Sequence, residues 1–450
     1  MDIILKNNIK ISDVPQGILK RITNTLTLNN PKYSDNIKMG RWNKGTPEKL
    51  TFYTIVGRNV EIPRGFMRPL INICKEENTQ FNIIDKRRAL KKISYTFNGK
   101  LKDYQVDAVD IMLTKDFGTL NAPTGSGKTV MALYLIAKRE QPSMIVVPTK
   151  ELAYQWTQRI GTFLNIPESE VGLIGCGKDY LGDKITVAMV QSLYKRVEKV
   201  SPKIGYVIVD ECHRAPSRTF SEALAGFDSK YMTGLSATPY RRDKLSQLIF
   251  WTLGNIIHSV DTEKLREKGN ILSVEPVIRT TDFNTLLNPS KDYSKVLKEL
   301  INDSERNHLI VKDVAAESKS SEGVLLVLSD RKAHCENLSA ILKFKYKIES
   351  TVLTGDTDLK ERKLIFDDLS NGKIKILIAT GQLVGEGFDC KDLSTLFLTT
   401  PVKFSGRLLQ YLGRVLRPAE NKEKARVFDY IDQNVGPLKS SGRARQTHYI

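Results

Sequence analysis

The stretch TLNAPTGSGKTVMALYLIAKR, at residues 119–139, decides the fold. An apolar run leads into a turn rich in Gly, Ser and Thr that ends in Lys128-Thr129, and an amphipathic segment follows from Val130 to Arg139. This order predicts a strand, a phosphate-binding loop and a helix. Such a unit belongs to the α/β folds, in which helices cover a parallel sheet.

The turn carries residues suited to binding a nucleotide. Its two glycines allow backbone N–H groups to close around phosphate oxygens at the positive end of the following helix. Lys128 is placed to reach the β and γ phosphates, and Thr129 to ligate Mg²⁺. Ala122 stands where the usual pattern has glycine, and it is small enough to preserve the loop. The predicted nucleotide-binding residues here are Thr124, Gly125, Ser126, Gly127, Lys128 and Thr129.

A second motif, YVIVDECH at residues 206–213, places two carboxylates at the end of an apolar strand. Parallel sheets present ligands at this end of their strands. Asp210 is suited to hold Mg²⁺, and Glu211 to orient and deprotonate the attacking water. Taken alone, the pair would also suit a solvated strand exit. Beside a phosphate loop it indicates phosphoryl transfer to water.

The alternation of short apolar runs and longer amphipathic segments occurs twice, which predicts two similar α/β lobes. The first series of expected strands is Thr119–Ala122, Met144–Val147, Ile185–Met189, Tyr206–Val209 and Met232–Ser236. The second is Val324–Leu328, Ser350–Leu353, Ile374–Ile378, Thr395–Leu398 and Arg426–Tyr430, with helices at Lys332–Lys343 and Leu359–Leu369.

The chain of 450 residues therefore divides into four predicted segments. Short alternating runs and turn signals in residues 1–95 indicate a small α+β domain. The lobes are expected at residues 96–265 and 321–450. Residues 266–320 are more polar and less periodic, which predicts a linker with accessory helices.

Charge points to a polyanionic partner. The net charge is +18, and residues 1–95 hold 18 Lys and Arg against 8 Asp and Glu, so more than half of the excess lies in about a fifth of the chain. Such a concentration suits contact with nucleic-acid phosphates. No apolar stretch is long enough for a bilayer, and the first residues do not resemble a secretory signal. We expect a monomer in the cytoplasm of its cell, or of the host cell if a phage encodes it.

The five cysteines are dispersed and form no CxxC pair. The five histidines are dispersed as well. This distribution predicts reduced thiols and no structural metal site.

Four motifs occur in the order found in superfamily 2 helicases, and the chain resembles that family from residue 101 to 432. They are the phosphate loop, the Asp-Glu-Cys-His box, LSATP at residues 235–239 and QYLGRVLR at residues 410–417. The resemblance implies two tandem RecA-like lobes that use ATP and Mg²⁺. It also implies ATP hydrolysis stimulated by nucleic acid.

The same resemblance assigns roles to single residues. Gln105 is implied to read adenine, and Gly387 with Asp389 to contact the ribose. Arg414 and Arg417 are implied to stabilise charge on the γ phosphate in the manner of an arginine finger. The implied catalytic set is Glu211, Lys128, Gln410, Arg414 and Arg417, and the residues implied to couple hydrolysis to movement are His213, Ser236 and Thr238.

Other segments match family positions that contact the tracked strand, namely Pro148, Thr149, Gln191, Ser192, Arg241, Arg242, Ser329, Arg331 and Thr380. In the N-terminal domain, Arg41, Arg64 and Arg68 are expected to grip phosphates, and neighbouring aromatic residues such as Trp42 to stack on a splayed base. The alternative for these residues is a solvated basic surface over an aromatic core.

Within the superfamily, the arginine-rich final motif and the compact basic N-terminus resemble the UvsW-like branch-migration helicases of tailed phages. RecG and XPB-type helicases are more distant in resemblance. This resemblance implies remodelling of forked DNA and Holliday junctions, with motion 3′ to 5′ on one strand. Three alternatives stay open at this point: an RNA-remodelling helicase, a duplex translocase that does not separate strands, and a non-catalytic DNA-binding scaffold.

Overall fold

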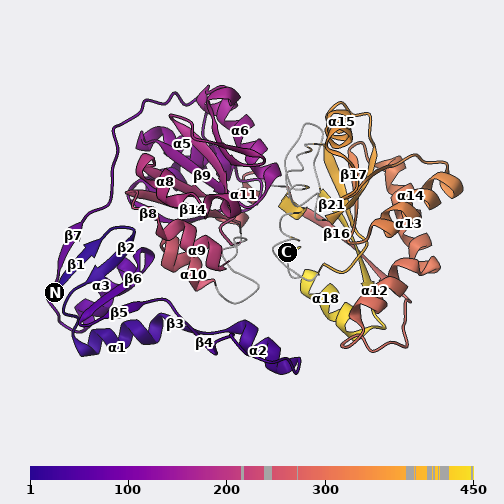
Figure 1. The fold of residues 1–450 in the computed structure, drawn as a ribbon. Coiled ribbons are helices and arrows are strands. Elements are labelled where there is room, and N and C mark those ends of the chain that lie inside the picture. The colour runs from indigo at the N-terminus through magenta and orange to yellow at the C-terminus, as the bar shows by residue number, and fades with distance from the viewer. Residues whose placement is uncertain are drawn as a thin grey trace. The chain divides into compact units, whose positions relative to one another are not determined.

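The computed structural model describes residues 1–213, 217–237, 246–270, 272–381, 390, 392–402, 408, 411–413, 415, 425–446 and 449. The chain forms two compact units (Figure 1). One consists of Met1–Ala122 with Gly127–Val260, and the other of Asp261–Ile450 with Pro123–Ser126. None of the helices in the described ranges is long and apolar enough to cross a membrane. The five cysteines, all of which are described, form no disulfide.

The N-terminal domain is built on a five-stranded sheet in the order β5-β6-β2-β1-β7. Its strands are β1 (Asp2–Leu5), β2 (Asn8–Ile11), β5 (Thr54–Val56), β6 (Asn59–Pro63) and β7 (Asn82–Asp85). Helices α1 (Gln16–Thr25) and α3 (Met67–Glu76) pack their apolar faces on it. The mixed α+β architecture expected for this part of the chain is present.

This domain shares its hydrophobic core with the first lobe. Leu248 and Trp251 of α10 (Gln247–Leu253) belong to the same buried cluster as the sheet residues of the N-terminal domain. Gly65 lies so close to α10 that an added Cβ would be 2.2 Å from the carbonyl oxygen of Phe250. The shared core therefore joins the N-terminal domain firmly to the lobe that follows it.

After β7 the chain crosses the first lobe in an extended segment. Backbone N–H groups of this segment donate to carbonyl groups of the lobe, from Arg88 to Asp228 and from Ile93 to Glu140. Asn98 donates to Phe163 in the same way. The expected domain boundary at residue 95 therefore falls within a strap that is bound to the lobe.

The first lobe is an eight-stranded sheet in the order β11-β10-β12-β9-β13-β14-β8-β15. Its strands are β8 (Phe117–Asn121), β9 (Ser143–Val147), β10 (Gly172–Gly175), β11 (Lys178–Tyr180), β12 (Ile185–Met189), β13 (Tyr206–Val209), β14 (Tyr231–Ser236) and β15 (Ile256–Ser259). All neighbouring strands are parallel except β10 and β11. The carboxyl ends of the central strands consequently meet at one edge.

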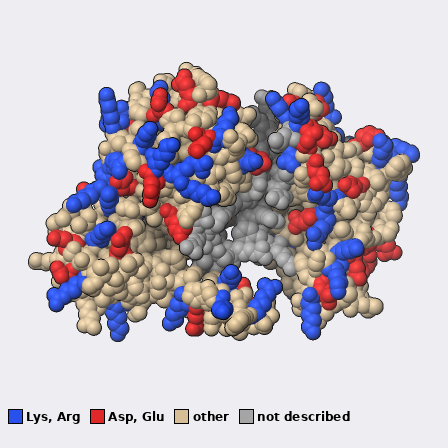
Figure 2. Space-filling view, viewed as in Figure 1, with Lys and Arg blue, Asp and Glu red and all other residues tan. Residues whose placement is uncertain are grey.

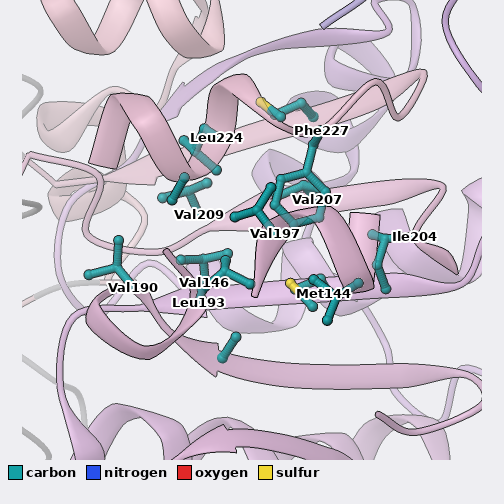
Figure 3. Packing of buried hydrophobic residues seen from close by; sticks show 14 of the residues in the cluster. Met144, Val146, Val190, Leu193, Val197, Ile204, Val207, Val209, Leu224 and Phe227 are labelled. Atoms are coloured by element: carbon teal, nitrogen blue, oxygen red, sulfur yellow. The ribbon is translucent and has the colours of Figure 1, made fainter. Parts of the chain in front are cut away.

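Central strands such as β9 and β13 are buried along their whole length. Helices cover both faces of a parallel sheet, so its strands are apolar throughout instead of alternating. Figure 3 shows part of this core, where Val146 and Val207 pack near Phe227. These continuous apolar runs explain why the sequence predicted β8, β9, β12, β13 and β14. The strands that it missed, β10, β11 and β15, lie at or beside the sheet edges.

The second lobe is a six-stranded parallel sheet in the order β16-β21-β20-β17-β19-β18. Its strands are β16 (Val274–Thr281), β17 (Val324–Ser329), β18 (Thr351–Leu353), β19 (Ile376–Thr380), β20 (Leu393–Leu398) and β21 (Ala425–Asp432). Its helices are α12 (Tyr293–Asn302), α13 (Ser304–Ser320), α14 (Lys332–Ile341), α15 (Leu359–Ser370) and α18 (Gly436–Gln446). All five strands expected here are present.

Residues 266–320, expected to form a linker with accessory helices, include such helices but also a strand of the second lobe. β16 pairs with β21 over eight residues as an edge strand, and α13 contributes Ile310 and Val314 to the core of the lobe. β16 contains Pro276 and exposed polar side chains, which edge strands tolerate. It therefore lacks the apolar run by which the buried strands were recognised.

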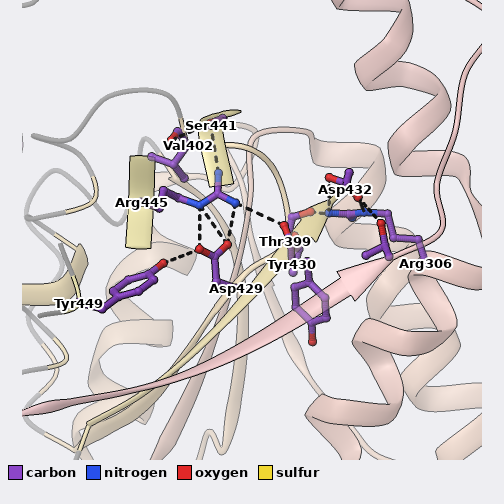
Figure 4. A network of polar contacts seen from close by, with 10 residues as sticks. Arg306, Thr399, Val402, Asp429, Tyr430, Asp432, Ser441, Arg445 and Tyr449 are labelled. Carbon is purple, nitrogen blue, oxygen red and sulfur yellow. Dashed lines mark hydrogen bonds and ion pairs between the residues drawn. The ribbon is translucent and has the colours of Figure 1, made fainter. Parts of the chain in front are cut away.

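Buried ion pairs lie between β21 and the helices of this lobe (Figure 4). Arg306 donates to Asp432 at 2.7 Å and to the carbonyl oxygen of Thr399 at 2.8 Å. Arg445 of α18 donates to Asp429 at 2.7 Å, and the Tyr449 hydroxyl donates to the same carboxylate at 2.7 Å. These pairs attach the C-terminal helix and α13 to the sheet.

Candidate ATP-hydrolysis site

The phosphate loop joins β8 to α5 (Lys128–Arg139), as the sequence predicted. Gly125 has φ +89° and Gly127 φ +80°, a left-handed conformation that glycine adopts without steric cost. The ammonium group of Lys128 donates to the carbonyl oxygen of Ala122 at 3.0 Å. The lysine therefore folds back over the loop, where phosphate oxygens would meet it.

Gln105 lies against this loop. The side chain is buried on α4 (Asp103–Leu113), and its Oε1 accepts from the backbone N–H of Lys102 at 3.0 Å. A Cβ added to Gly127 would stand 2.4 Å from Gln105 Nε2. Backbone conformation favours glycine at this position, and a larger residue would also displace the Gln105 side chain. The contact is consistent with the adenine-reading role assigned to Gln105, which stays a prediction.

The two carboxylates follow β13 directly, two strands from β8 across the sheet. Asp210 is buried, and its Oδ1 accepts from the backbone N–H of Glu211 at 2.9 Å. Burial and the neighbouring charge of Glu211 raise the pKa of Asp210 to about 6. Glu211 has φ +46°, a conformation that costs free energy for a residue with a side chain and is found preferentially at functional sites.

Trp156 is a further site residue, which the sequence did not reveal. Its indole N–H donates to Asp210 Oδ2 at 2.8 Å, and the ring is buried. Trp156 belongs to α6 (Lys150–Leu164), whose first residues follow Pro148 and Thr149. One helix thus links the predicted strand-contacting segment to the predicted metal ligand. A tryptophan on the apolar face of a helix is ordinarily read as core, so only the fold could identify this contact.

His213 joins the carboxylates to the next strand. Its Nδ1 lies 2.9 Å from Ser236 Oγ at the end of β14 and 3.3 Å from Glu211 Oε2. The backbone N–H of Ala122, at the start of the phosphate loop, donates to the carbonyl oxygen of Ser236 at 2.9 Å. Through these contacts β8, β14 and β13 form a connected series at the sheet edge. The coupling role of His213 and Ser236 stays a prediction.

The residues present suit a magnesium nucleotide. Thr129 is in the first turn of α5 and supplies a hydroxyl oxygen, while Asp210 supplies a carboxylate, and Mg²⁺ prefers oxygen ligands. Within the described residues, the contacts of the buried Asp210 side chain come from an indole and a backbone N–H and include no arginine. The charge of Lys128 lowers the pKa of Asp210, but burial has the larger effect and raises it. A bound cation would further offset the cost of burying this carboxylate.

The predicted strand-contacting residues of the first lobe lie on the same edge. Thr149 caps α6 by accepting from the backbone N–H of Leu152 at 3.4 Å. The Gln191 amide donates to the carbonyl oxygen of Pro148 at 3.5 Å. Gln191 is exposed, and both it and Ser192 lie in the short helix α7 (Val190–Leu193) that follows β12, the neighbour of β9. The parallel sheet thus brings Pro148, Thr149, Gln191 and Ser192 together.

In the second lobe, Arg331 is exposed and Thr380 partly exposed at the carboxyl ends of β17 and β19. Ser329 differs, because it is buried and its hydroxyl lies 3.0 Å from Nδ1 of the buried His334. Its hydroxyl also accepts from the backbone N–H of Arg331 at 3.1 Å. We therefore assign Ser329 to the internal support of this strand end and remove it from the set that touches nucleic acid.

In the N-terminal domain, Arg41 and Arg68 are exposed. Arg64 is 3% exposed and donates to the carbonyl oxygens of Phe227 and Ser229, at 3.4 and 3.0 Å. Burial lowers the pKa of Arg64 to about 9. The expectation that Arg64 grips DNA phosphates is therefore corrected: this arginine joins the N-terminal domain to the first lobe.

Several predicted site residues lie outside the described residues, and their roles stay as predicted. They are Thr238, Arg241, Arg242, Gly387, Asp389, Gln410, Arg414 and Arg417.

Comparison with known proteins identifies the family. Residues 98–241 match the family model described as Type III restriction enzyme, res subunit, and residues 299–419 match the helicase conserved C-terminal domain. One match lies in each lobe, and together they include all four motifs. The chain is a superfamily 2 helicase. ATP hydrolysis therefore drives its activity.

This helicase has relatives of comparable length. It is 28% identical over 383 residues to the DNA 3'-5' translocase XPB2 of Sulfurisphaera tokodaii, covering 77% of this chain and 85% of the relative. It is 27% identical over 361 residues to the ATP-dependent DNA helicase uvsW of Enterobacteria phage T4, covering 77% and 71%. A fragment of an HsdR subunit of a type I restriction enzyme from Vibrio vulnificus has the same fold, with a TM-score of 0.56 at 20% identity over 78% of this chain and 66% of that one.

Proposed function

We propose that this helicase is a monomeric, magnesium-dependent motor that tracks along one strand of DNA in the 3′ to 5′ direction and remodels branched DNA, namely forks and Holliday junctions. One observation carries the proposal. The phosphate loop, the carboxylates, the His213–Ser236 pair and the predicted strand-contacting residues occupy one edge of one sheet, in the strand order β8, β14, β13, β9, β12.

Each group at this edge has a part in hydrolysis. Lys128 neutralises charge on the transferred phosphate, and backbone N–H groups of the loop hold its oxygens. Glu211 orients the attacking water and takes up its proton. When bound, Mg²⁺ supplies further charge neutralisation, and Thr129 and Asp210 are the residues that would hold it.

The same contacts provide a route from hydrolysis to the nucleic acid. A change in the protonation of Glu211 acts on His213, which contacts both Glu211 and Ser236. A displacement of Asp210 acts on Trp156, and through it on α6, whose first turn lies beside Thr149. Hydrolysis can thereby change how the lobe holds the strand.

The choice of branched DNA is supported by the relatives and by the N-terminal domain. The relatives above are named as a DNA translocase and a DNA helicase. The N-terminal domain concentrates positive charge and shares a hydrophobic core with the first lobe. A basic body fixed to the motor is placed to hold duplex phosphates while the motor pulls a single strand, and phosphate contacts make binding largely independent of sequence.

An RNA-remodelling activity is the second candidate. A protein of Acanthamoeba polyphaga mimivirus that is 26% identical over 366 residues is named as an ATP-dependent RNA helicase. Phosphate contacts alone do not distinguish the two polymers, since the 2′-hydroxyl is the group that does so.

ATP turnover in the presence of different polynucleotides tests the proposal. We expect the greatest stimulation with forked DNA, less with single-stranded DNA, and little with duplex DNA or RNA. Stimulation by RNA alone would favour the second candidate, whereas stimulation by duplex without strand displacement would indicate a duplex translocase. An absence of hydrolysis under all conditions would leave only a scaffold.

A further inference from the structure

Residues 27–51 form an arm that extends from the N-terminal domain. Its base is a two-stranded ribbon of β3 (Thr27–Asn29) and β4 (Lys49–Thr51), and its outer part holds α2 (Pro31–Lys38) and the loop at residues 39–48. Figure 1 shows β3, β4 and α2 leading away from α1 and the five-stranded sheet. No residue of α2 is buried. The arm therefore contributes little to the core of its own domain.

Hydrogen bonds hold the outer part of the arm in shape. Asn30 caps α2 by accepting from the backbone N–H of Lys32 at 3.1 Å, and its amide donates to the carbonyl oxygen of Pro47 at 2.7 Å. The Asn36 amide donates to Asn43 Oδ1 at 2.9 Å. These bonds tie the loop to the helix, so the tip has a defined structure without a hydrophobic core.

The tip, which we define as residues 37–44, exposes three large apolar side chains. Ile37 is 60% exposed, Met39 63% and Trp42 84%. The other tryptophans of this chain, Trp156 and Trp251, are only 2% and 6% exposed. An exposed apolar cluster at the end of an arm marks an interaction surface, because each of these side chains gains free energy when water is removed from it.

Positive charge alternates with these apolar residues. Lys38, Arg41 and Lys44 lie between or beside them, and Lys44 Nζ is 5.6 Å from the centre of the Trp42 ring. The whole arm holds five Lys and Arg against two acidic residues. Figure 2 shows Lys and Arg side chains on many parts of the exposed surface, so charge alone does not distinguish the arm. The arm differs from the rest of the surface because it combines cations with an exposed tryptophan.

The domain that carries the arm is joined to the ATP-binding lobe. Arg88 pairs with Asp228 at 2.8 Å and Arg87 with Asp116 at 2.8 Å, in addition to the buried Arg64 described above. Since these contacts connect the domain to β8 and its neighbours, displacement of the first lobe along a strand displaces the base of the arm as well.

We propose that the tip of the arm contacts the branch point of the DNA, where Trp42 stacks on the unpaired base next to the duplex and Lys38, Arg41 and Lys44 hold the adjoining phosphates. The inference rests on the proposed function and names the element that separates the strands. Stacking on an aromatic ring requires no particular base, and the flanking cations complement phosphate charge. Trp, Met and Arg also occur at protein interfaces, but lysine is depleted there, so Lys38 and Lys44 favour a phosphate partner.

Forks with 2-aminopurine at the first unpaired position test the stacking. The protein is expected to quench this fluorophore, and Trp42→Ala to abolish the quenching and to weaken fork binding by roughly 5- to 150-fold, the range for loss of one stacked base. Trp42→Phe should retain most of both. Phe344→Ala removes a 72% exposed aromatic residue from the second lobe and serves as the control. Equal quenching and affinity for Trp42→Ala and the parent protein would overturn the inference and leave the tip to a protein partner.

A second measurement isolates the cations. Reversal of charge at Lys38, Arg41 and Lys44 should lower the slope of log affinity against log salt by about 2 to 3 for forks. The same reversal at three exposed lysines of the second lobe, Lys343, Lys345 and Lys347, is the matched control. An equal fall in slope for both triple variants would contradict a specific role for the tip.

The two proposals fail in distinguishable ways. If the parent protein shows no ATP turnover stimulated by nucleic acid, the proposed function is wrong. If the parent protein hydrolyses ATP and displaces strands, and Trp42→Ala does so at the same rate with unchanged fork affinity, only the branch-point role of the arm is wrong.

Discussion

The two lobes have similar sheets, but the carboxylate that follows β13 and the carboxylates of β21 have different partners. In the first lobe, Asp210 accepts hydrogen bonds from an indole and a backbone N–H, and burial raises its pKa to about 6. In the second lobe, Asp429 and Asp432 are each paired with a buried guanidinium, and Glu317 is paired with Arg426 at 2.9 Å. A carboxylate already neutralised by arginine stabilises the packing of helices on the sheet. A buried carboxylate without such a partner has capacity left for a cation.

The largest expected effect concerns Glu211, the residue proposed to orient water in the first lobe. Glu211→Gln would remove this proposed general base, and such groups contribute about 10²- to 10⁴-fold to rate. We expect turnover to fall by that factor while ATP binding persists, as measured by steady-state hydrolysis and by binding of a fluorescent ATP analogue. Asp210→Asn is the companion variant and should lose the dependence on Mg²⁺ as well. Hydrolysis by Glu211→Gln at the parent rate would remove this residue from the mechanism.

The second lobe should respond to loss of charge mainly through stability. Asp429→Asn leaves Arg445 buried without its partner, and breaking such a pair costs about 3–5 kcal/mol. Urea unfolding followed by hydrogen exchange of the second lobe measures this change. Lys373→Met breaks an exposed pair with Asp368 and should leave the midpoint unchanged. If Lys373→Met shifted the unfolding midpoint as much as Asp429→Asn does, the buried pair of Asp429 and Arg445 would have no special role in stability.

A fall in pH should change the stability contributed by His334 in the second lobe and by Asp210 in the first lobe in opposite directions. Burial lowers the pKa of His334 to about 3, below its unfolded value of 6.5, so the unfolded chain takes up a proton first and stability falls as pH drops below 6.5. Between pH 6.5 and 5 this amounts to about 2 kcal/mol at most. The pKa of Asp210 is raised from 3.8 to about 6, so its contribution to stability falls as pH rises through that range.

Unfolding free energies at several pH values test this difference. His334→Gln should flatten the loss of stability of the second lobe between pH 6.5 and 5, and His308→Gln, on the neighbouring helix, is the control. Equal slopes for the parent protein and His334→Gln would show that His334 is not held neutral.

A further effect is expected from the loss of one hydrogen bond to Asp210, the predicted metal ligand. Trp156→Phe keeps most of the ring volume but removes the donor to Asp210, and a hydrogen bond to a charged group is worth about 1.5–3 kcal/mol. We expect the concentration of Mg²⁺ or nucleic acid that gives half-maximal ATP turnover to rise by about 10- to 150-fold, measured by titration of each. Trp251→Phe, a buried tryptophan outside the site, should leave both titrations unchanged.

The sequence predicted correctly those strands and loops that are encoded in consecutive residues. Strand β13 and the carboxylates after it were predicted because a strand buried on both faces is apolar throughout and ends abruptly at a polar residue. Edge strand β16 was predicted to be a linker because four of its eight residues are exposed and its sequence mixes polar and apolar residues. Ser329 and Arg64 were assigned to nucleic acid from residue type and position, and burial, which residue type does not report, excludes both.

The sequence by itself determined the two-lobed α/β class, the phosphate loop and the carboxylate pair, since each is encoded in consecutive residues whose spacing follows from strand and helix geometry. Tertiary structure decided which distant side chains meet. Trp156 reaches Asp210 because β9 and β13 are neighbours in the sheet, and Gln105 abuts Gly127 because α4 packs beside the loop. Contacts of this kind depend on strand order and packing, which no single stretch of the chain specifies.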